Sequence, residues 1–159
     1  MLNPPLSRMR GKSKLRKQIL TMITEHTCYI EAFFGAGGVL FGKDPSKVEV
    51  INDVDQELMN LFKMIKHHPK QIERLLQFEV SGRDQYYEHK NAQINALTEI
   101  ERAVRFIYVI SQCFASKGIS YGYGTNTRPA PQIFDTTNLL RVTAARCQEE
   151  IWGTDHNQL

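Results

Sequence analysis

Near the start of the chain, an acidic residue and a glycine cluster are followed by a second acidic residue. Residues Glu31–Gly38 read E-A-F-F-G-A-G-G, and Asp53 lies 18 residues after Gly35. Glycines that directly follow a strand let the backbone turn sharply and approach a ligand closely. A carboxylate about 20 residues further on, at the end of the next strand, can accept hydrogen bonds from a ribose diol. The pattern therefore predicts a site for a nucleoside-containing cofactor.

The acidic residue at the end of the first strand narrows the class of cofactor. A strict dinucleotide fingerprint reads G-x-G-x-x-G, whereas Gly35–Gly38 read G-x-G-G. The Glu31 carboxylate would repel a pyrophosphate, but it suits the cationic sulfonium and amino groups of S-adenosylmethionine. We therefore expect Glu31 at the methionine end of that cofactor and Asp53 at its ribose. The alternative is a glycine-rich turn in a small α/β domain, with Asp53 only capping a helix.

The elements around these residues alternate between helix and strand. A helix is predicted over residues 14–23. Two short β-prone runs follow, at Thr27–Glu31 and Val48–Asn52, and the glycine loop and a short helix lie between them. Asp55 is a plausible N-cap for a further helix. The apolar positions expected in that helix are Leu58, Leu61, Phe62 and Ile65. This alternation predicts an α/β fold with a parallel sheet covered by helices.

The second half of the chain has a different pattern. From Pro69 to about Ser111 we expect two helices and no clear strand between them. Residues at helical spacing mark a first helix with Ile72, Leu75 and Leu76 and a longer one with Leu97, Ile100, Val104, Ile107 and Ser111. Residues 113–134 are rich in Gly, Ser, Thr, Asn and Pro, which fits either an ordered hairpin or a mobile loop. A last helix is expected over about 136–150, with a doubtful strand from Ile151. Two clear strands are few for a stable sheet, so association with a complementing chain or with a second copy is expected.

The overall composition is that of an ordinary globular protein. Hydrophobic residues make up 42% of the chain, and no apolar stretch approaches the roughly 18–20 residues of a membrane-spanning helix. The basic run Arg8–Lys17 leads into an amphipathic stretch and not a continuous apolar one, so no signal peptide is expected. Three widely spaced cysteines fit a reducing cytoplasm and suggest neither disulfides nor a zinc site. His67-His68 has no further ligands at metal-site spacing, so no metal is predicted. The net charge of +3 is compatible with a polyanionic partner.

Three motifs, in this order, resemble those of the Dam-type adenine-specific DNA methyltransferases. They are Gly11–Leu15 (G-K-S-K-L), Tyr29–Gly37 and Asn52–Leu61, and Arg105–Tyr108 and Arg128–Pro131 resemble phage and prophage members most. The resemblance implies a Rossmann-like S-adenosylmethionine-dependent methyltransferase fold, of the kind that also serves restriction-modification systems. It also implies methyl transfer from the cofactor to the exocyclic amine of adenine in double-stranded DNA.

The resemblance further implies a division of the chain and a set of site residues. Residues 1–61 would bind the cofactor, 62–135 would form a helical target-recognition region with a DNA-contacting loop, and 136–159 would return to the methyltransferase domain. The implied cofactor-binding residues are Met9, Gly11, Lys12, Glu31, Phe33, Gly35, Ala36, Gly37 and Asp53. The residues expected to contact DNA are Lys14, Lys117, Tyr121, Tyr123 and Arg128.

The chain departs from the family pattern in three ways. Arg10 replaces the first glycine of G-G-K, Ala32 replaces a proline, and the catalytic Asp-Pro-Pro-Tyr is missing from the 159 residues. Residues Asn3–Leu6 (N-P-P-L) cannot substitute, because no strand precedes them and leucine cannot stack on a flipped base as an aromatic ring does. No catalytic residue is therefore predicted, and the isolated chain is expected to be inactive.

Three alternatives to an active enzyme follow from these departures. The chain could be a truncated or decayed remnant that binds cofactor or DNA, or one half of a split methyltransferase. It could also bind another nucleotide cofactor such as NAD.

Overall fold

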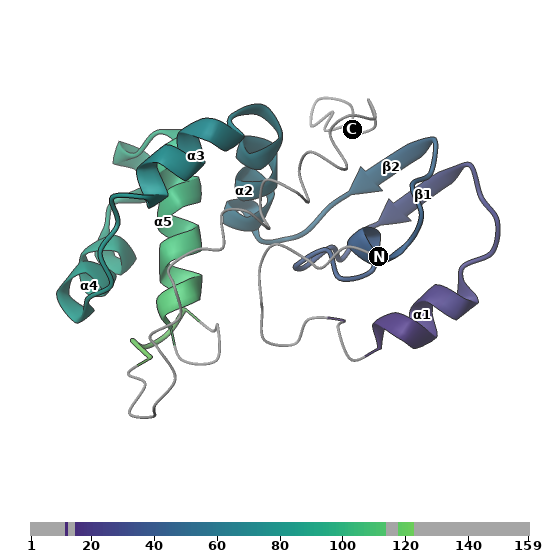
Figure 1. Ribbon diagram of the computed structural model, residues 1–159, viewed down its shortest axis with the longest axis horizontal. Helices are drawn as coiled ribbons and strands as arrows, with labels where there is room; N and C mark the ends of the chain where they lie inside the picture. Colours follow the sequence, from purple (N-terminus) through teal and green to yellow (C-terminus); the bar gives the residue numbers. More distant parts are fainter. Residues whose placement is uncertain (1–11, 13–14, 114–117, 123–159) are drawn as a thin grey trace.

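The computed structural model describes residue 12, residues 15–113 and residues 118–122. In Figure 1 the helices α2 to α5 lie together on one side, and the two strands and α1 lie on the other. The elements in chain order are α1 Arg16–Met22, β1 Cys28–Glu31, the 3-10 helix η1 Leu40–Gly42, β2 Val48–Ile51, α2 Gln56–His67, α3 Pro69–Leu76, α4 Arg83–Asn91, the 3-10 helix η2 Ile94–Ala96 and α5 Glu99–Gln112.

The two strands form a parallel pair, as the sequence predicts. Cys28 lies opposite Val48, and Glu31 lies opposite Ile51. The crossover between them contains the glycine loop and η1. Within the described residues the chain is thus a mixed α/β structure with a small parallel sheet.

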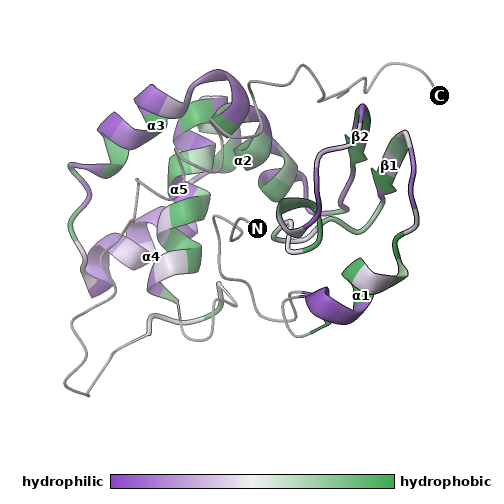
Figure 2. Cartoon of the chain, turned by 45° about the vertical axis from the view of Figure 1, so that its right-hand side comes forward, coloured by the Kyte–Doolittle hydropathy of each residue, from purple (hydrophilic) through white to green (hydrophobic). Residues whose placement is uncertain are grey.

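Helices α2 and α5 carry the apolar core. All four predicted apolar positions of α2 are buried, and the helix begins at Asp55, whose carboxylate accepts a hydrogen bond from the Leu58 amide at 3.2 Å. Helix α5 begins with a capping box in which Thr98 and Glu101 each accept from the other's backbone amide. Figure 2 shows apolar residues concentrated in α2 and α5, while α4 is mostly polar. Both predicted helices are confirmed.

Helix α4 was not predicted from the sequence. It reads R-D-Q-Y-Y-E-H-K-N and has no apolar residues at helical spacing, although Tyr86 within it is fully buried. Its last turn is held from outside, because the Arg105 guanidinium donates to the carbonyls of His89 and Lys90 at 2.6 and 3.0 Å. Tertiary contacts, which local periodicity does not report, therefore place this helix.

Helix α1 is confirmed, but none of the apolar residues that predict it is fully buried; they are Leu15, Ile19, Met22 and Ile23. Leu15 and Met22 are exposed, whereas Arg16 is buried. The Arg16 guanidinium lies against Gly42 so closely that a Cβ on Gly42 would collide with it. A side chain at position 42 would therefore have to displace the end of the Arg16 side chain.

The region after α5 turns back on itself. Cys113 and Tyr121 form an antiparallel bridge, and the Gly122 amide donates to the Gln112 carbonyl at 2.8 Å. Residues 121 and 122 therefore pair with the end of α5 and the residue that follows it. The helix and strand expected beyond residue 135 lie outside the described residues.

Candidate functional site

The carboxyl ends of β1 and β2 bring the two predicted acidic residues to one edge of the sheet. Strand pairing continues past the strands, because the Asn52 amide donates to the Glu31 carbonyl at 3.0 Å and the Phe34 amide donates to the Asn52 carbonyl at 2.9 Å. The loops after both strands are therefore joined at their bases. This edge is where ligands bind in open parallel sheets.

Asp53 joins the glycine loop to the start of α2. Its Oδ2 accepts from the Gly35 amide at 2.7 Å, and its Oδ1 accepts from the Asp55 amide at 3.0 Å. The link between the glycine loop and Asp53 is thus a direct contact. Because an ionised carboxylate has about four acceptor positions, these two bonds leave capacity for further donors such as a ribose diol.

Two glycines of the loop adopt conformations that other residues rarely reach. The φ angles of Gly35 and Gly37 are 58° and 73°, in the left-handed region. A Cβ on Gly37 would also lie 2.5 Å from the Phe41 ring and 2.7 Å from the Phe34 ring. Among the described residues, no atom beyond the chain neighbours of Gly35 lies within 4 Å of the corresponding position on Gly35, so that side of the loop is open within this part of the chain. The open face at Gly35 is where a ligand can approach the backbone.

The two phenylalanines before the glycines point in opposite directions. Phe34 is 1% exposed and packs edge-on against Phe62 of α2, with ring centroids 4.8 Å apart. Phe33 is 81% exposed. Ala36 is buried and offers only its backbone to this edge. The loop is therefore anchored in the core by one aromatic ring and presents the other outward.

Glu31 is a buried carboxylate with two donors. Its Oε1 lies 2.5 Å from Lys12 Nζ, which also donates to the Phe33 carbonyl at 2.6 Å. The Tyr29 hydroxyl donates to Oε2 at 3.2 Å. A buried charge is tolerated only when it is paired and hydrogen-bonded, and both conditions hold here.

The structure brings together seven of the predicted cofactor residues. Contacts or chain continuity place them at the same sheet edge, and they are Lys12, Glu31, Phe33, Gly35, Ala36, Gly37 and Asp53. Tyr121 is partly buried and packs near Tyr86 with ring centroids 5.6 Å apart, and its contact with DNA stays a prediction. The remaining predicted site residues lie outside the described part of the chain, and they are Met9, Gly11, Lys14, Lys117, Tyr123 and Arg128.

Sequence reasoning missed Tyr29 as a partner of Glu31. The signal was available, because alternate residues of a strand face the same side and Tyr29 lies two positions before Glu31. Burial is the largest cause that raises the pKa of Tyr29, and the nearby charge of Glu31 is the second. The phenol therefore keeps its proton and remains a donor at neutral pH.

Two further observations concern metals and membranes. Among the described residues, no group of three or more His, Cys, Asp and Glu side chains is placed to hold a metal ion. In the same residues, every helix is too short or too polar to cross a membrane.

The arrangement at the sheet edge is suited to binding: it combines an acidic group for a cation, an open glycine backbone and a second carboxylate for hydroxyl groups.

Comparisons with known proteins identify a family that the sequence matches. The model of the D12 class N6 adenine-specific DNA methyltransferases matches residues 11–138. The Type II methyltransferase M1.LlaDCHI of Lactococcus lactis subsp. cremoris is 32% identical over 107 residues, which cover 63% of this chain and 37% of the relative. The Type II methyltransferase M.MjaIII of Methanocaldococcus jannaschii is 30% identical over 142 residues, which cover 72% of this chain and 47% of the relative.

A DNA adenine methylase of Serratia marcescens is 29% identical over 109 residues, which cover 65% of this chain and 40% of the relative. The matched parts are therefore less than half of each of these relatives. Since the family model matches most of the sequence, the chain belongs to the D12 class N6 adenine-specific DNA methyltransferases.

Proposed function

We propose that this chain provides the S-adenosylmethionine-binding part of a methyltransferase that acts on adenine in double-stranded DNA. The observation that carries the proposal is the sheet edge at which the buried Glu31, the open backbone of Gly35 and the Asp53 carboxylate meet. Family membership supports the same cofactor and the same class of substrate.

Each group at the edge has a role in the proposal. Glu31 holds the cationic methionine end of the cofactor, because it is a carboxylate fixed in place by Lys12 and Tyr29. Asp53 accepts from the ribose hydroxyls while its bonds to Gly35 and Asp55 keep it in position. Phe33 is exposed at the same edge and offers an apolar surface.

For the second half of the chain we propose a target-recognition region over about 62–135. Helix α2 runs from residue 56 to residue 67 without a break, so it joins this region to the cofactor-binding part. Lys90 of α4 donates to the Ile119 carbonyl, and Tyr121 packs near Tyr86. These contacts support an anchored base for a DNA-contacting loop whose further residues include Tyr123 and Arg128.

The proposal assigns no catalytic residue within the 159 residues. Attack by the adenine amine requires an acceptor for its hydrogens and an aromatic face for the flipped base. Asp-Pro-Pro-Tyr supplies both in the family, and the sequence does not contain it. We therefore expect the chain alone to bind the cofactor without transferring its methyl group to duplex DNA, which a filter assay with labelled S-adenosylmethionine measures.

Calorimetric titration tests the proposed cofactor. The chain is titrated separately with S-adenosylmethionine and with NAD. We expect saturable binding of S-adenosylmethionine and at least tenfold weaker binding of NAD, because Glu31 attracts a cation and repels a pyrophosphate. A preference for NAD would show that the site belongs to another class of nucleotide-binding protein.

A further inference from the structure

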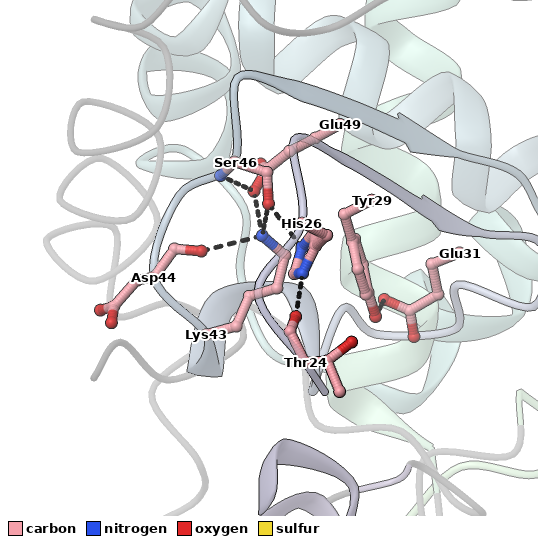
Figure 3. A network of polar contacts seen from close by, with 8 residues as sticks. All are labelled: Thr24, His26, Tyr29, Glu31, Lys43, Asp44, Ser46 and Glu49. Atoms are coloured by element: carbon pink, nitrogen blue, oxygen red, sulfur yellow. Dashed lines mark hydrogen bonds and ion pairs between the residues drawn. The ribbon is translucent and has the colours of Figure 1, made fainter. Parts of the chain in front are cut away.

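Tyr29 stands between two charged groups on the inner face of the sheet. It shares a face of β1 with Glu31, and the strand register places it opposite Glu49 of β2. Its hydroxyl donates to Glu31 Oε2. Figure 3 shows the Tyr29 ring between Lys43 on one side and Glu31 on the other. The ring therefore connects the cofactor-site carboxylate to a second set of polar groups.

That second set is centred on a buried ion pair. Lys43 Nζ lies 2.6 Å from Glu49 Oε1, and the two side chains are 5% and 4% exposed. The ammonium also donates to Ser46 Oγ at 2.6 Å and to the Asp44 carbonyl at 2.8 Å. The Ser46 amide donates to Glu49 Oε1 at 3.1 Å. Three acceptors surround the ammonium, so its position is closely defined.

The ion pair and a neighbouring histidine hold the tyrosine ring. Lys43 Nζ lies 4.6 Å from the centroid of the Tyr29 ring, within the range of a cation–π interaction. The His26 ring lies 5.7 Å from the same ring, and its Nε2 forms a hydrogen bond of 2.8 Å with Ser46 Oγ. These contacts restrict the direction in which the Tyr29 hydroxyl can point.

We propose that Tyr29 is a positioning residue that orients the Glu31 carboxylate toward the cationic end of the cofactor, and that the Lys43–Glu49 pair holds Tyr29 for this task. The inference rests on the proposed function, because it assumes that Glu31 binds the cofactor. Lys12 fixes one oxygen of Glu31 from a side chain that is 35% exposed, and Tyr29 fixes the other from the interior. With one donor on each oxygen, the plane of the carboxylate is set and lone pairs remain for a ligand.

Removal of the Tyr29 hydroxyl should weaken cofactor binding only modestly. The bond of 3.2 Å from Tyr29 to Glu31 is longer than most O–H···O hydrogen bonds, which are about 2.7–2.8 Å. Losing it should weaken cofactor binding about three- to tenfold, less than for a typical hydrogen bond to a charged group, because this bond is long and acts on the cofactor only through Glu31. The substitution Tyr29→Phe removes only the hydroxyl and keeps the ring between Lys43 and Glu31, so the variant should fold.

The test is a double-mutant cycle on S-adenosylmethionine affinity, measured by calorimetry for the wild-type chain, Tyr29→Phe, Glu31→Gln and the double variant. We expect Tyr29→Phe to weaken binding about three- to tenfold in the wild-type background and less than about twofold in the Glu31→Gln background. Tyr108→Phe is a matched control, because the Tyr108 hydroxyl of α5 donates to the Val80 carbonyl between α3 and α4 and has no contact with Glu31 among the described hydrogen bonds. It should lower the melting temperature and leave the affinity unchanged.

The outcomes separate the inference from the proposed function. If Glu31→Gln weakens binding but Tyr29→Phe does not, or if Tyr29→Phe has the same effect in both backgrounds, Tyr29 is a packing residue and the inference is wrong. If Glu31→Gln leaves the affinity unchanged, the assignment of Glu31 and the proposed function fail together. A coupled loss, with unchanged melting temperature for Tyr29→Phe, supports the inference.

Discussion

Glu31 and Glu49 project from the same face of the sheet and are almost equally buried, yet their surroundings differ. Glu49 pairs with a lysine that is itself 5% exposed, and the backbone amide of Ser46 donates to the same oxygen. Glu31 pairs with a lysine that is 35% exposed and lies beside an open glycine loop. Burial alone therefore does not distinguish a structural carboxylate from a binding one. We propose that the exposure of the lysine partner distinguishes the two, with Glu31 as the binding carboxylate.

The largest expected difference in stability is between variants of the two lysines, Lys43 and Lys12. Lys43→Met removes the ammonium partner of a buried carboxylate, which should lower the free energy of unfolding by about 3–5 kcal/mol. Lys12→Met removes a partner that is partly in water, and Tyr29 still donates to the buried Glu31 carboxylate, so this substitution should cost clearly less than Lys43→Met. Thermal or urea unfolding of both variants measures the difference. Equal losses would show that the two ion pairs are of the same kind.

The two glycines of the loop offer a similar contrast. Gly37→Ala should destabilise the fold by about 2–4 kcal/mol, because the new methyl group would meet the Phe34 and Phe41 rings and the positive φ would be strained. Gly35→Ala faces open space and should cost only about 1–2 kcal/mol from backbone strain. Its main effect should be on cofactor affinity. Urea unfolding and calorimetry of the two variants test this separation, and a reversed order of stability would contradict it.

The elements that carry this comparison were predictable from the sequence to different degrees. Periodic apolar residues identified α2 and α5, and the glycines with Asp53 identified the sheet edge, because these signals are local. The pairing of Lys43 with Glu49 was not predicted, since it forms only when the crossover folds back on β2. The burial of Arg16 against Gly42 escaped prediction for the same reason.

A third carboxylate, fully exposed, extends the comparison. The Thr98 backbone amide and hydroxyl donate to Glu101, and the backbone bond is the larger of the two causes that lower the pKa of Glu101 below its ordinary value. Because the folded state favours the ionised form, the stabilisation is present above the ordinary glutamate pKa. It is lost as the pH falls through the lowered value.

Unfolding of the wild-type chain and of Glu101→Gln, compared between about pH 2 and pH 6, measures this contribution. We expect the difference between the two chains to shrink toward acid pH. A difference that grows as the pH falls would contradict the capping role of the Glu101 carboxylate. The effect should be the smallest of those described, since the group is exposed to solvent.

Glu31 and Glu49 are expected to have different roles, in cofactor binding and in stability, and one paired measurement tests this difference directly. The melting temperature and the S-adenosylmethionine affinity are determined for Glu31→Gln and Glu49→Gln under the same conditions. We expect Glu31→Gln to weaken binding about 10- to 100-fold with a small change in melting temperature, as for the loss of a charged hydrogen-bonding partner. Glu49→Gln should lower the melting temperature more and the affinity less than about threefold. Unchanged affinity in Glu31→Gln, or parallel losses of affinity and stability in both variants, would contradict these roles.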